Sequence, residues 1–351
     1  MKRRARAGVV ALLLATPHVA LAFCPAKTCD PSVPEQHCEV DALTKCVTSG
    51  ESLFWSSNCV TFSIQKDAAP SAGISYSNIE ASVKRGFVAW TKADCGGKSP
   101  SLRLTLSEPV SCDASEYNLK AKNANVIVFR EDEWPYEGAE DALGLTRVRF
   151  DTDVNVGELF DADIELNAVS EPLAVGQPKT HEVDLDSLVT HELGHALGLA
   201  HSLDSGSTML AGYTKGSTNA RTLGDDDVAG VCETYPPERK AASSSCEPRH
   251  GFSELCGADQ PIEAPSAPGG AGSASDDSAN ESSGCTFAPP CSTSARRAIG
   301  LLGASICAGV FWLRRRRAPR ALRPMLVAPL GLLHTKPASA ETPCSWRCRS
   351  A

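Results

Sequence analysis

Short apolar runs alternate with helical patterns between about Leu53 and Tyr235. The runs expected to form strands are residues 59–64, 102–106, 125–129, 143–150 and 162–167. Residues 76–93 are expected to form a helix with Ser77 as its N-cap, because large apolar side chains recur there at helical spacing. The pattern predicts one domain, residues 51–237, with an α+β or α/β core.

Two further helices are expected in the second half of this domain. One would begin after Asp184, a good N-cap, and end at Gly198. Its apolar face would consist of Leu185, Leu188, Val189, Leu193, Ala196 and Leu197. The last would run from about Asp225 to Tyr235, where three initial aspartates suit the positive end of the helix dipole.

The ends of the chain differ from this domain in composition. Residues 1–22 combine a basic start, an apolar run and small residues at Ala20 and Ala22, which is typical of a secretory signal. Residues 238–290 are rich in serine, proline and glycine, which predicts a linker. Residues 291–317 hold an apolar stretch followed by four arginines. This favours a transmembrane or sorting segment that leaves the domain outside the membrane.

The cysteine content supports export, and the charge argues against nucleic acid as a partner. The chain has 15 cysteines and a net charge of -8. Four cysteines crowd residues 23–50, and ten lie between Cys24 and Cys256. In an oxidising compartment they are expected to form disulfides of undetermined pairing, with a zinc ribbon as the alternative. No basic face is available for nucleic acid.

The candidate chemistry lies in residues 191–201, which read HELGHALGLAH. His191 and His195 are four apart, so both imidazoles would lie on one face of the second helix. Gly198 can adopt the left-handed conformation that ends a helix, which would bring His201 in as a third ligand. Three nitrogens leave one position open, as catalytic zinc sites do. Glu192 could then exchange protons with a zinc-activated water as general base and acid.

A chance occurrence, or an ordinary amphipathic helix with solvated histidines, is the alternative interpretation of this motif. Five fixed positions of HExxHxxGxxH make coincidence improbable. A second alternative is a non-catalytic, zinc-stabilised binding or adhesion module of the same fold. Such a module has no use for Glu192 beside the metal, so the glutamate favours a peptidase acting on protein or peptide substrates.

The extended motif, followed by HSLDSGSTMLAGY at residues 201–213 and LGDDDVAGVCETYP at residues 223–236, resembles the matrixin family of metzincin metalloproteases. The resemblance implies an α+β fold with a twisted mixed sheet of about five strands, three helices and HExxH on the active-site helix. It also implies one catalytic Zn²⁺, Met209 in a Met-turn beneath it, and Ser202 after the third ligand.

Substrate contacts follow from the same resemblance. Residues 211–213, ending at Tyr213, would form the wall of the pocket for the side chain after the cut, although Ala211 replaces the usual proline. Leu143, Gly144, Leu145 and Thr146 would lie on an edge strand that binds extended substrate. The cysteine switch and the structural-zinc histidine loop of the animal enzymes are absent.

Two further features extend the resemblance. Carboxylates between Asp151 and Asp163 could bind Ca²⁺ or could simply form a turn. The C-terminal arrangement of Cys285, Cys291, an apolar stretch and arginines resembles bacterial sorting tags of the MYXO-CTERM type. It implies an extracellular or cell-surface protein of a bacterium. Such tags normally end after the arginines, so residues 318–351 stay unexplained.

Overall fold

The computed structural model describes residues 23–31, 33–136 and 139–257, and three short strands nearer the C-terminus. Its centre is a six-stranded sheet: β2 (Phe54–Trp55), β3 (Cys59–Ile64), β4 (Arg103–Leu106), β5 (Asn125–Arg130), β6 (Gly144–Phe150) and β7 (Glu158–Asn167). The order is β2-β7-β5-β3-β4, and β6 also pairs with β7. Only the β6–β7 pair is antiparallel within this sheet, so the expected mixed sheet is confirmed.

The sheet differs from the sequence expectation in two places. Strand β2, which was not predicted, contains only two residues and pairs in parallel with the start of β7. Strand β7 begins at Glu158 rather than at residue 162. The reason is the β6–β7 hairpin, whose register pairs Arg149 with Asp161 and Phe150 with Leu159.

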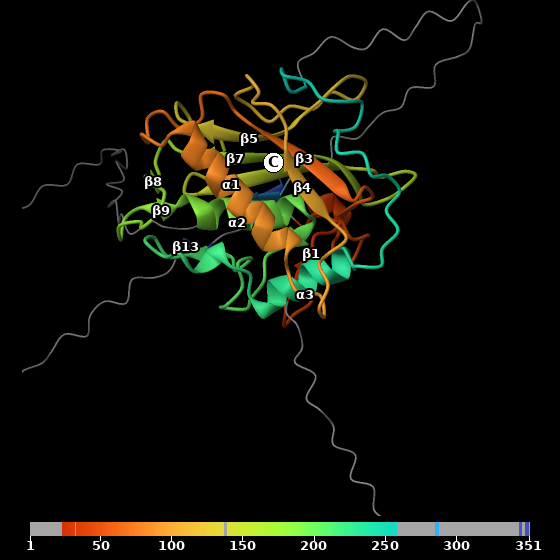
Figure 1. Ribbon diagram of the computed structural model, residues 1–351. Helices are drawn as coiled ribbons and strands as arrows, with labels where there is room; N and C mark the ends of the chain where they lie inside the picture. Colours follow the sequence, from red (N-terminus) through yellow and green to blue (C-terminus); the bar gives the residue numbers. More distant parts are fainter. Residues whose placement is uncertain are drawn as a thin grey trace, which may run out of the picture. The chain divides into compact units, whose positions relative to one another are not determined.

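Three α-helices occur in the described part of the chain, as expected: α1 (Tyr76–Thr91), α2 (Leu185–Ala196) and α3 (Asp225–Thr234). Two 3₁₀ turns, Pro34–Gln36 and Asn219–Arg221, complete the helical elements there. Figure 1 shows α1 crossing one face of the sheet. The N-cap prediction for α1 is wrong by two positions, because Ser75 is the extended residue whose Oγ accepts from the Asn78 amide. Asp184 caps α2 as predicted, accepting from the Ser187 amide at 2.9 Å.

Two buried tryptophans fix the position of α2 in the core. Trp90 of α1 donates to the Thr190 carbonyl at 2.8 Å, and Trp55 of β2 donates to the Ala196 carbonyl at 2.8 Å. Both indoles lie in the hydrophobic core. Because a buried indole N–H needs an acceptor, these bonds set how α2 lies against α1 and the sheet.

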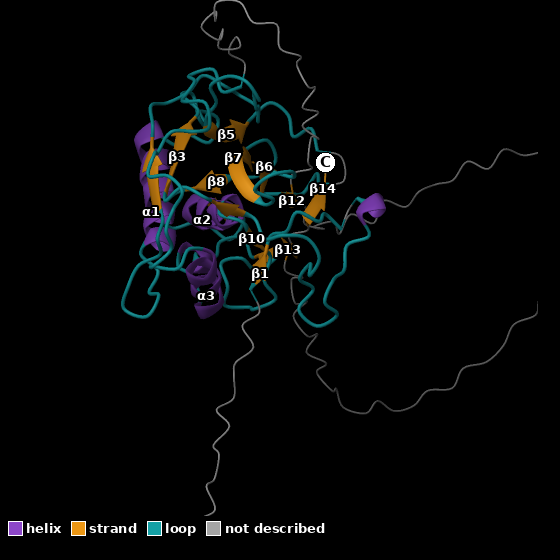
Figure 2. Cartoon of the chain, turned by 90° about the vertical axis from the view of Figure 1, so that its right-hand side faces the viewer, coloured by secondary structure: helices purple, strands orange, loops and turns teal. Residues whose placement is uncertain are grey.

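The N-terminal segment, residues 23–50, is closed by two disulfides, Cys24–Cys46 and Cys29–Cys38. Its first strand, β1 (Cys24–Pro25), pairs antiparallel with β10 (Leu199–Ala200), directly after α2. Figure 2 shows this pair beside α2 and α3. The cysteines of the segment are therefore engaged in disulfides, which excludes the zinc-ribbon alternative for them.

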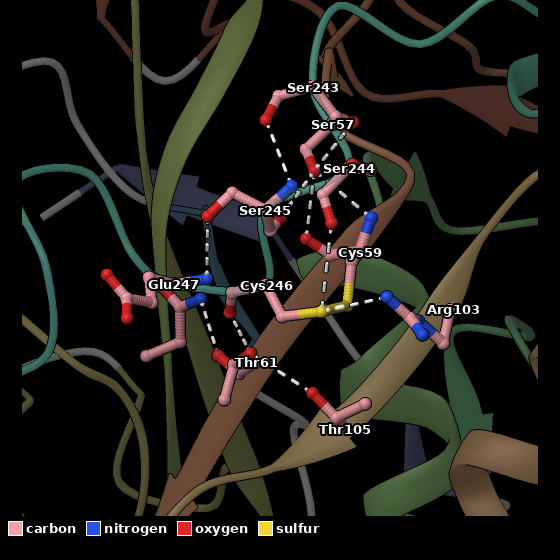
Figure 3. Close-up of a disulfide and its surroundings, with 11 residues drawn as sticks. Ser57, Cys59, Thr61, Arg103, Thr105, Ser243, Ser244, Ser245, Cys246 and Glu247 are labelled. Atoms are coloured by element: carbon pink, nitrogen blue, oxygen red, sulfur yellow. Dashed lines mark hydrogen bonds between the residues drawn. A yellow bond between two sulfur atoms is a disulfide. The ribbon is translucent and has the colours of Figure 1, made fainter.

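Residues 238–257, which the composition placed in a linker, instead lie against the domain. Cys246 is bonded to Cys59 of β3, and Cys256 to Cys112. Around the first of these bridges the Thr61 hydroxyl donates to the Cys246 carbonyl, as Figure 3 shows. The Arg239 guanidinium donates to the Trp55 carbonyl at 2.7 Å. Serine-rich composition was misleading here because two disulfides hold this stretch, and Phe252 packs against a small apolar cluster beside the second of them.

One further disulfide and three pairs of short strands complete the described structure. Cys95 is bonded to Cys232. Strands β8 (Leu173–Ala174) and β9 (Val183–Asp184) pair in parallel. The antiparallel pairs are β11 (Gly212–Tyr213) with β13 (Cys344–Ser345), and β12 (Cys285–Phe287) with β14 (Cys348–Ser350).

The predicted signal, residues 1–22, and the predicted membrane or sorting segment, residues 291–317, lie outside the described residues. So do most of the predicted linker beyond residue 257 and most of residues 318–351. None of the helices in the described part of the chain has the length and apolar character needed to cross a membrane.

Candidate metal centre

Three histidines converge at the end of α2. His191 and His195 lie one turn apart on this helix, and their Nε2 atoms are 3.1 Å apart. Gly198 has the left-handed φ of +87° that the turn after the helix requires, and β10 then leads to His201. One ligand atom from each histidine lies within 4.8 Å of the others. No second group of three His, Cys, Asp or Glu side chains is spaced this way within the described residues.

Backbone carbonyls orient two of the three rings. The His191 Nδ1 lies 2.7 Å from the Thr208 carbonyl, and the His195 Nδ1 lies 2.8 Å from the Leu199 carbonyl. A carbonyl can only accept, so each Nδ1 carries the proton and each Nε2 keeps a lone pair. This is the arrangement in which metal-binding imidazoles are normally held. The donor set and its orientation therefore fit a zinc ion.

Burial keeps these imidazoles neutral. His191 is 2% exposed, and burial lowers its pKa to about 4. Burial and the neighbouring histidines lower the pKa of His195 well below its usual value. The pKa of His201 is lowered by the same two causes. Since only the neutral imidazole binds a metal, no proton has to leave before an ion binds near neutral pH.

Glu192 is fully buried next to the first histidine and has one hydrogen-bonded oxygen. The Thr146 hydroxyl lies 2.7 Å from its Oε2. Its Oε1 has no hydrogen-bond partner among the described residues. Burial raises the pKa of Glu192 to about 8, and the bond from Thr146 opposes that rise. The carboxyl group thus has an open oxygen that can exchange a proton with another molecule.

Gly144 of β6 makes room for this carboxyl group. A Cβ atom at that position would lie 2.6 Å from Glu192 Oε1 and 2.9 Å from Cδ. Such distances are shorter than any van der Waals contact, so a larger residue would displace the glutamate. Gly144 and Thr146, two residues apart on one face of β6, therefore together define where Glu192 lies.

The predicted Met-turn residue lies directly against α2. Met209 is 2% exposed, and a Cβ atom at Gly194 of α2 would lie 2.2 Å from its sulfur. Asp227 of α3 holds this turn by accepting from the amides of Thr208 at 2.6 Å and Met209 at 3.0 Å. The Thr208 carbonyl in turn accepts from His191, so Asp227 helps to position the His191 ring through residue Thr208.

Ser202, the residue after the third histidine, is hydrogen-bonded to α3. Its hydroxyl donates to the Asp226 carboxylate at 2.6 Å. The sequence interpretation assigned the aspartates of α3 to the helix dipole and missed these contacts. A helix-start signal explains acidic residues there without any long-range partner, so only the fold could reveal their role.

The residues predicted to bind substrate are all buried. Leu143, Leu145 and Thr146 are at most 2% exposed. Only their backbone groups are therefore suited to contact an extended peptide. The Tyr213 hydroxyl donates to the Ser217 carbonyl at 2.7 Å and accepts from the Asp184 amide at 2.9 Å. Tyr213 thus links the wall segment to the N-cap of α2, and its role in substrate binding stays a prediction.

A cavity of about 490 Å³ lies between α2 and residues 205–222, and His191 lines it. Gly212 and Tyr213 of the predicted pocket wall also line it. Hydroxyl and amide side chains supply much of the remaining surface, from Ser187, Ser207, Thr208, Ser217, Thr218 and Asn219. The wall segment therefore borders both the histidine cluster and a cavity large enough for a side chain.

The carboxylates proposed for calcium have protein partners at three positions, of which Glu158 accepts from the Ser56 hydroxyl. Asp151 accepts from the Asp153 and Val154 amides at 2.8 and 3.0 Å, so it acts as a turn former. Asp163 accepts from the Val126 amide at 2.9 Å and from the Ser115 hydroxyl at 3.0 Å. Calcium binding by these carboxylates stays a prediction.

Comparisons with known proteins agree with this geometry. The sequence profile described as Matrixin (Peptidase_M10) matches residues 54–236, slightly more than half of the 351 residues. Human matrix metalloproteinase-16 is 38% identical over 81 residues, which cover 23% of this chain and 12% of that protein. Metalloendoproteinase 1 of Glycine max is 26% identical over 156 residues, covering 44% of this chain and 45% of that protein.

A third relative matches over a shorter stretch. Metalloendoproteinase 1-MMP of Arabidopsis thaliana is 45% identical over 58 residues, covering 16% of each protein. The matched stretch spans less than half of the length of each of these three relatives. The profile match covers the central sheet, the three helices and all three histidines. The chain therefore belongs to the matrixin family of metalloproteases.

Proposed function

We propose that this chain is an exported, zinc-dependent endopeptidase that hydrolyses peptide bonds of proteins or peptides. The observation that carries the proposal is the buried Glu192, whose Oε1 has no hydrogen-bond partner among the described residues and which directly follows a histidine of the cluster. An unsatisfied buried carboxyl oxygen destabilises a fold, so its presence calls for a functional reason.

The proposed mechanism assigns His191, His195 and His201 as the three zinc ligands. A zinc ion held by these three nitrogens would lower the pKa of a water molecule and would polarise a substrate carbonyl. Glu192 takes a proton from the attacking water through Oε1 and then gives it to the departing amine. Thr146 holds Oε2, so the carboxyl group keeps one orientation through both transfers. No covalent bond forms between the chain and the substrate.

Substrate would be held by backbone groups in this proposal. Residues 143–146 would bond an extended peptide through their N–H and C=O groups, because their side chains are buried. The side chain after the cut would enter the cavity of about 490 Å³ that Gly212 and Tyr213 line. Its hydroxyl-rich lining favours a polar side chain or one with a polar end.

A non-catalytic, zinc-stabilised binding module is the second candidate. The three histidines alone fit that function as well as they fit catalysis. Glu192 distinguishes the peptidase from the binding module, because a structural zinc site is closed by a fourth ligand and needs no proton acceptor. Export rests on the basic and apolar start of the chain and agrees with the disulfides. A location outside a bacterial cell, and membrane attachment through residues 291–317, remain part of this proposal.

The function can be tested by incubating the purified exported chain with an unfolded protein. We expect peptide-bond cleavage that a chelator stops and that added zinc restores. Glu192→Ala is the control, because it retains the three histidines and removes the proton acceptor. Zinc binding by the wild type without cleavage above the Glu192→Ala level would support the binding module instead.

A further inference from the structure

A second cavity, of about 240 Å³, lies between the N-terminal segment and the rest of the domain, and His201 lines it. Its lining combines residues between 24 and 53, two residues of β6, and residues between 200 and 211. The apolar residues that line it include Val47, Leu53, Val148, Phe150, Leu203 and Ala211. An apolar hollow of this size beside a metal centre can bury one large apolar side chain.

This cavity continues the proposed substrate site along β6. Side chains on one face of a strand alternate, so Gly144, Thr146, Val148 and Phe150 share a face. The first two lie against Glu192, and the last two line the cavity. With a rise of about 3.4 Å per residue, the cavity begins about two residues beyond Thr146 and ends about four residues beyond it.

The N-terminal wall of the cavity is held in place before any substrate binds. Strand β1 pairs with β10, so that Cys24 lies opposite Ala200, the residue before His201. The Ala26 amide donates to the Gly198 carbonyl at 2.8 Å, and the Leu53 amide donates to the Ala26 carbonyl at 2.9 Å. The Cys24–Cys46 disulfide closes the segment. A preformed wall loses little conformational entropy on binding.

We propose that this cavity binds a large apolar side chain of the substrate, located two to four residues before the cut. A peptide that adds antiparallel to β6, the more stable pairing, runs with its amino-terminal half toward Phe150. The disulfide-closed N-terminal segment is then a permanent wall of the substrate cleft and determines specificity. This inference rests on the proposed peptidase function.

The test compares pairs of peptides that differ only by Leu or Ala at the second, third or fourth position before the cut. For the wild-type full chain we expect kcat/KM to be at least about tenfold higher for Leu at one of these positions. Val47→Trp fills the cavity and should reduce that ratio below about twofold, because kcat/KM for the Leu peptide falls more than kcat/KM for the Ala peptide. Leu43→Trp is the matched control, because Leu43 lies on the same segment, does not line the cavity and is 85% exposed.

A second variant guards against misfolding of Val47→Trp. Leu203 is 53% exposed, so Leu203→Ser should fold normally and should also lower the Leu/Ala ratio. Absence of the preference in the wild type, or its persistence in both variants, would overturn the inference. An equal loss for both peptides would do the same, since it would indicate a blocked cleft. If no peptide is cleaved in a chelator-sensitive way, the proposed function itself fails.

Discussion

Two glutamates in the described part of this domain are fully buried, and they differ in how their oxygens are satisfied. Glu165 of β7 accepts from the Tyr136 hydroxyl at 2.5 Å and is paired with the Arg130 guanidinium, with Arg147 at 3.6 Å. Glu192 of α2 has a bond from Thr146 to Oε2, while its Oε1 has no hydrogen-bond partner among the described residues. Both side chains are 0% exposed.

The difference separates a structural carboxylate from the one that we propose to be catalytic. Burying a charge is unfavourable unless partners replace the water that it loses, and Glu165 has those partners. Glu192 has such a partner at only one of its two oxygens, and it lies beside three neutral imidazoles. We therefore expect changes at Glu165 to affect stability and changes around Glu192 to affect catalysis.

The largest effect should come from removing a proposed zinc ligand. His201→Ala leaves two of the three nitrogens, so zinc affinity and kcat/KM should both fall by more than about 100-fold. Zinc content by mass spectrometry of the native protein and peptide hydrolysis measure the two quantities. Retention of both at the wild-type level would remove His201 from the site.

The comparison predicts opposite behaviour for the two glutamates in denaturant. Glu165→Gln leaves the Arg130 charge poorly compensated and should lower the free energy of unfolding by about 3 kcal/mol. Glu192→Gln removes a buried carboxyl group that has one unsatisfied oxygen, so it should leave that free energy unchanged or higher. Denaturant titration with disulfides intact provides both values. Equal destabilisation by the two variants would contradict the distinction.

Thr146 should matter for turnover rather than for binding. Thr146→Val removes the hydroxyl that holds Glu192 Oε2 and should lower kcat by about 10- to 100-fold, with KM and zinc content unchanged. Thr146→Ser should recover most of the loss. Thr61→Val is the matched control, since Thr61 is also a largely buried strand residue, with its hydroxyl 3.1 Å from Thr105. A loss of kcat in Thr61→Val equal to that in Thr146→Val would assign the effect to general packing.

The smallest expected effect is a change in the pH dependence of stability, caused by Asp161 and Asp163, which are buried on the same face of β7. Burial raises the pKa of both carboxyl groups, so between about pH 4 and neutrality the folded state binds more protons than the unfolded state. Stability should therefore fall as pH rises through this range when calcium is chelated. Asp161→Asn should weaken that dependence of the melting temperature by a few degrees. A steeper dependence in the variant would contradict this explanation.

Sequence patterns were sufficient for the features that depend on local spacing. The helical spacing of His191, Glu192 and His195, the cap at Asp184 and the left-handed turn at Gly198 are properties of neighbouring residues. The apolar runs also located the main strands, because burial of a strand leaves a continuous apolar pattern.

Features that depend on distant residues could not be predicted in this way. The Thr208 carbonyl that orients His191 and the Asp227 carboxylate that holds the turn at Met209 are tertiary contacts without a local pattern. The packing of residues 238–257 depends on the Cys59–Cys246 and Cys112–Cys256 pairings, which sequence alone leaves open. Strand β2 is too short to show periodicity.

The most direct test of the central claim is the kcat of Glu192→Gln at a measured zinc content equal to that of the wild type. We expect a loss of at least about 100-fold in peptide hydrolysis, because Gln cannot accept the proton from water. The fold and the bond from Thr146 should be retained, since Gln has nearly the same shape. Wild-type turnover by this variant, with zinc bound, would contradict the assignment of Glu192 as the general base.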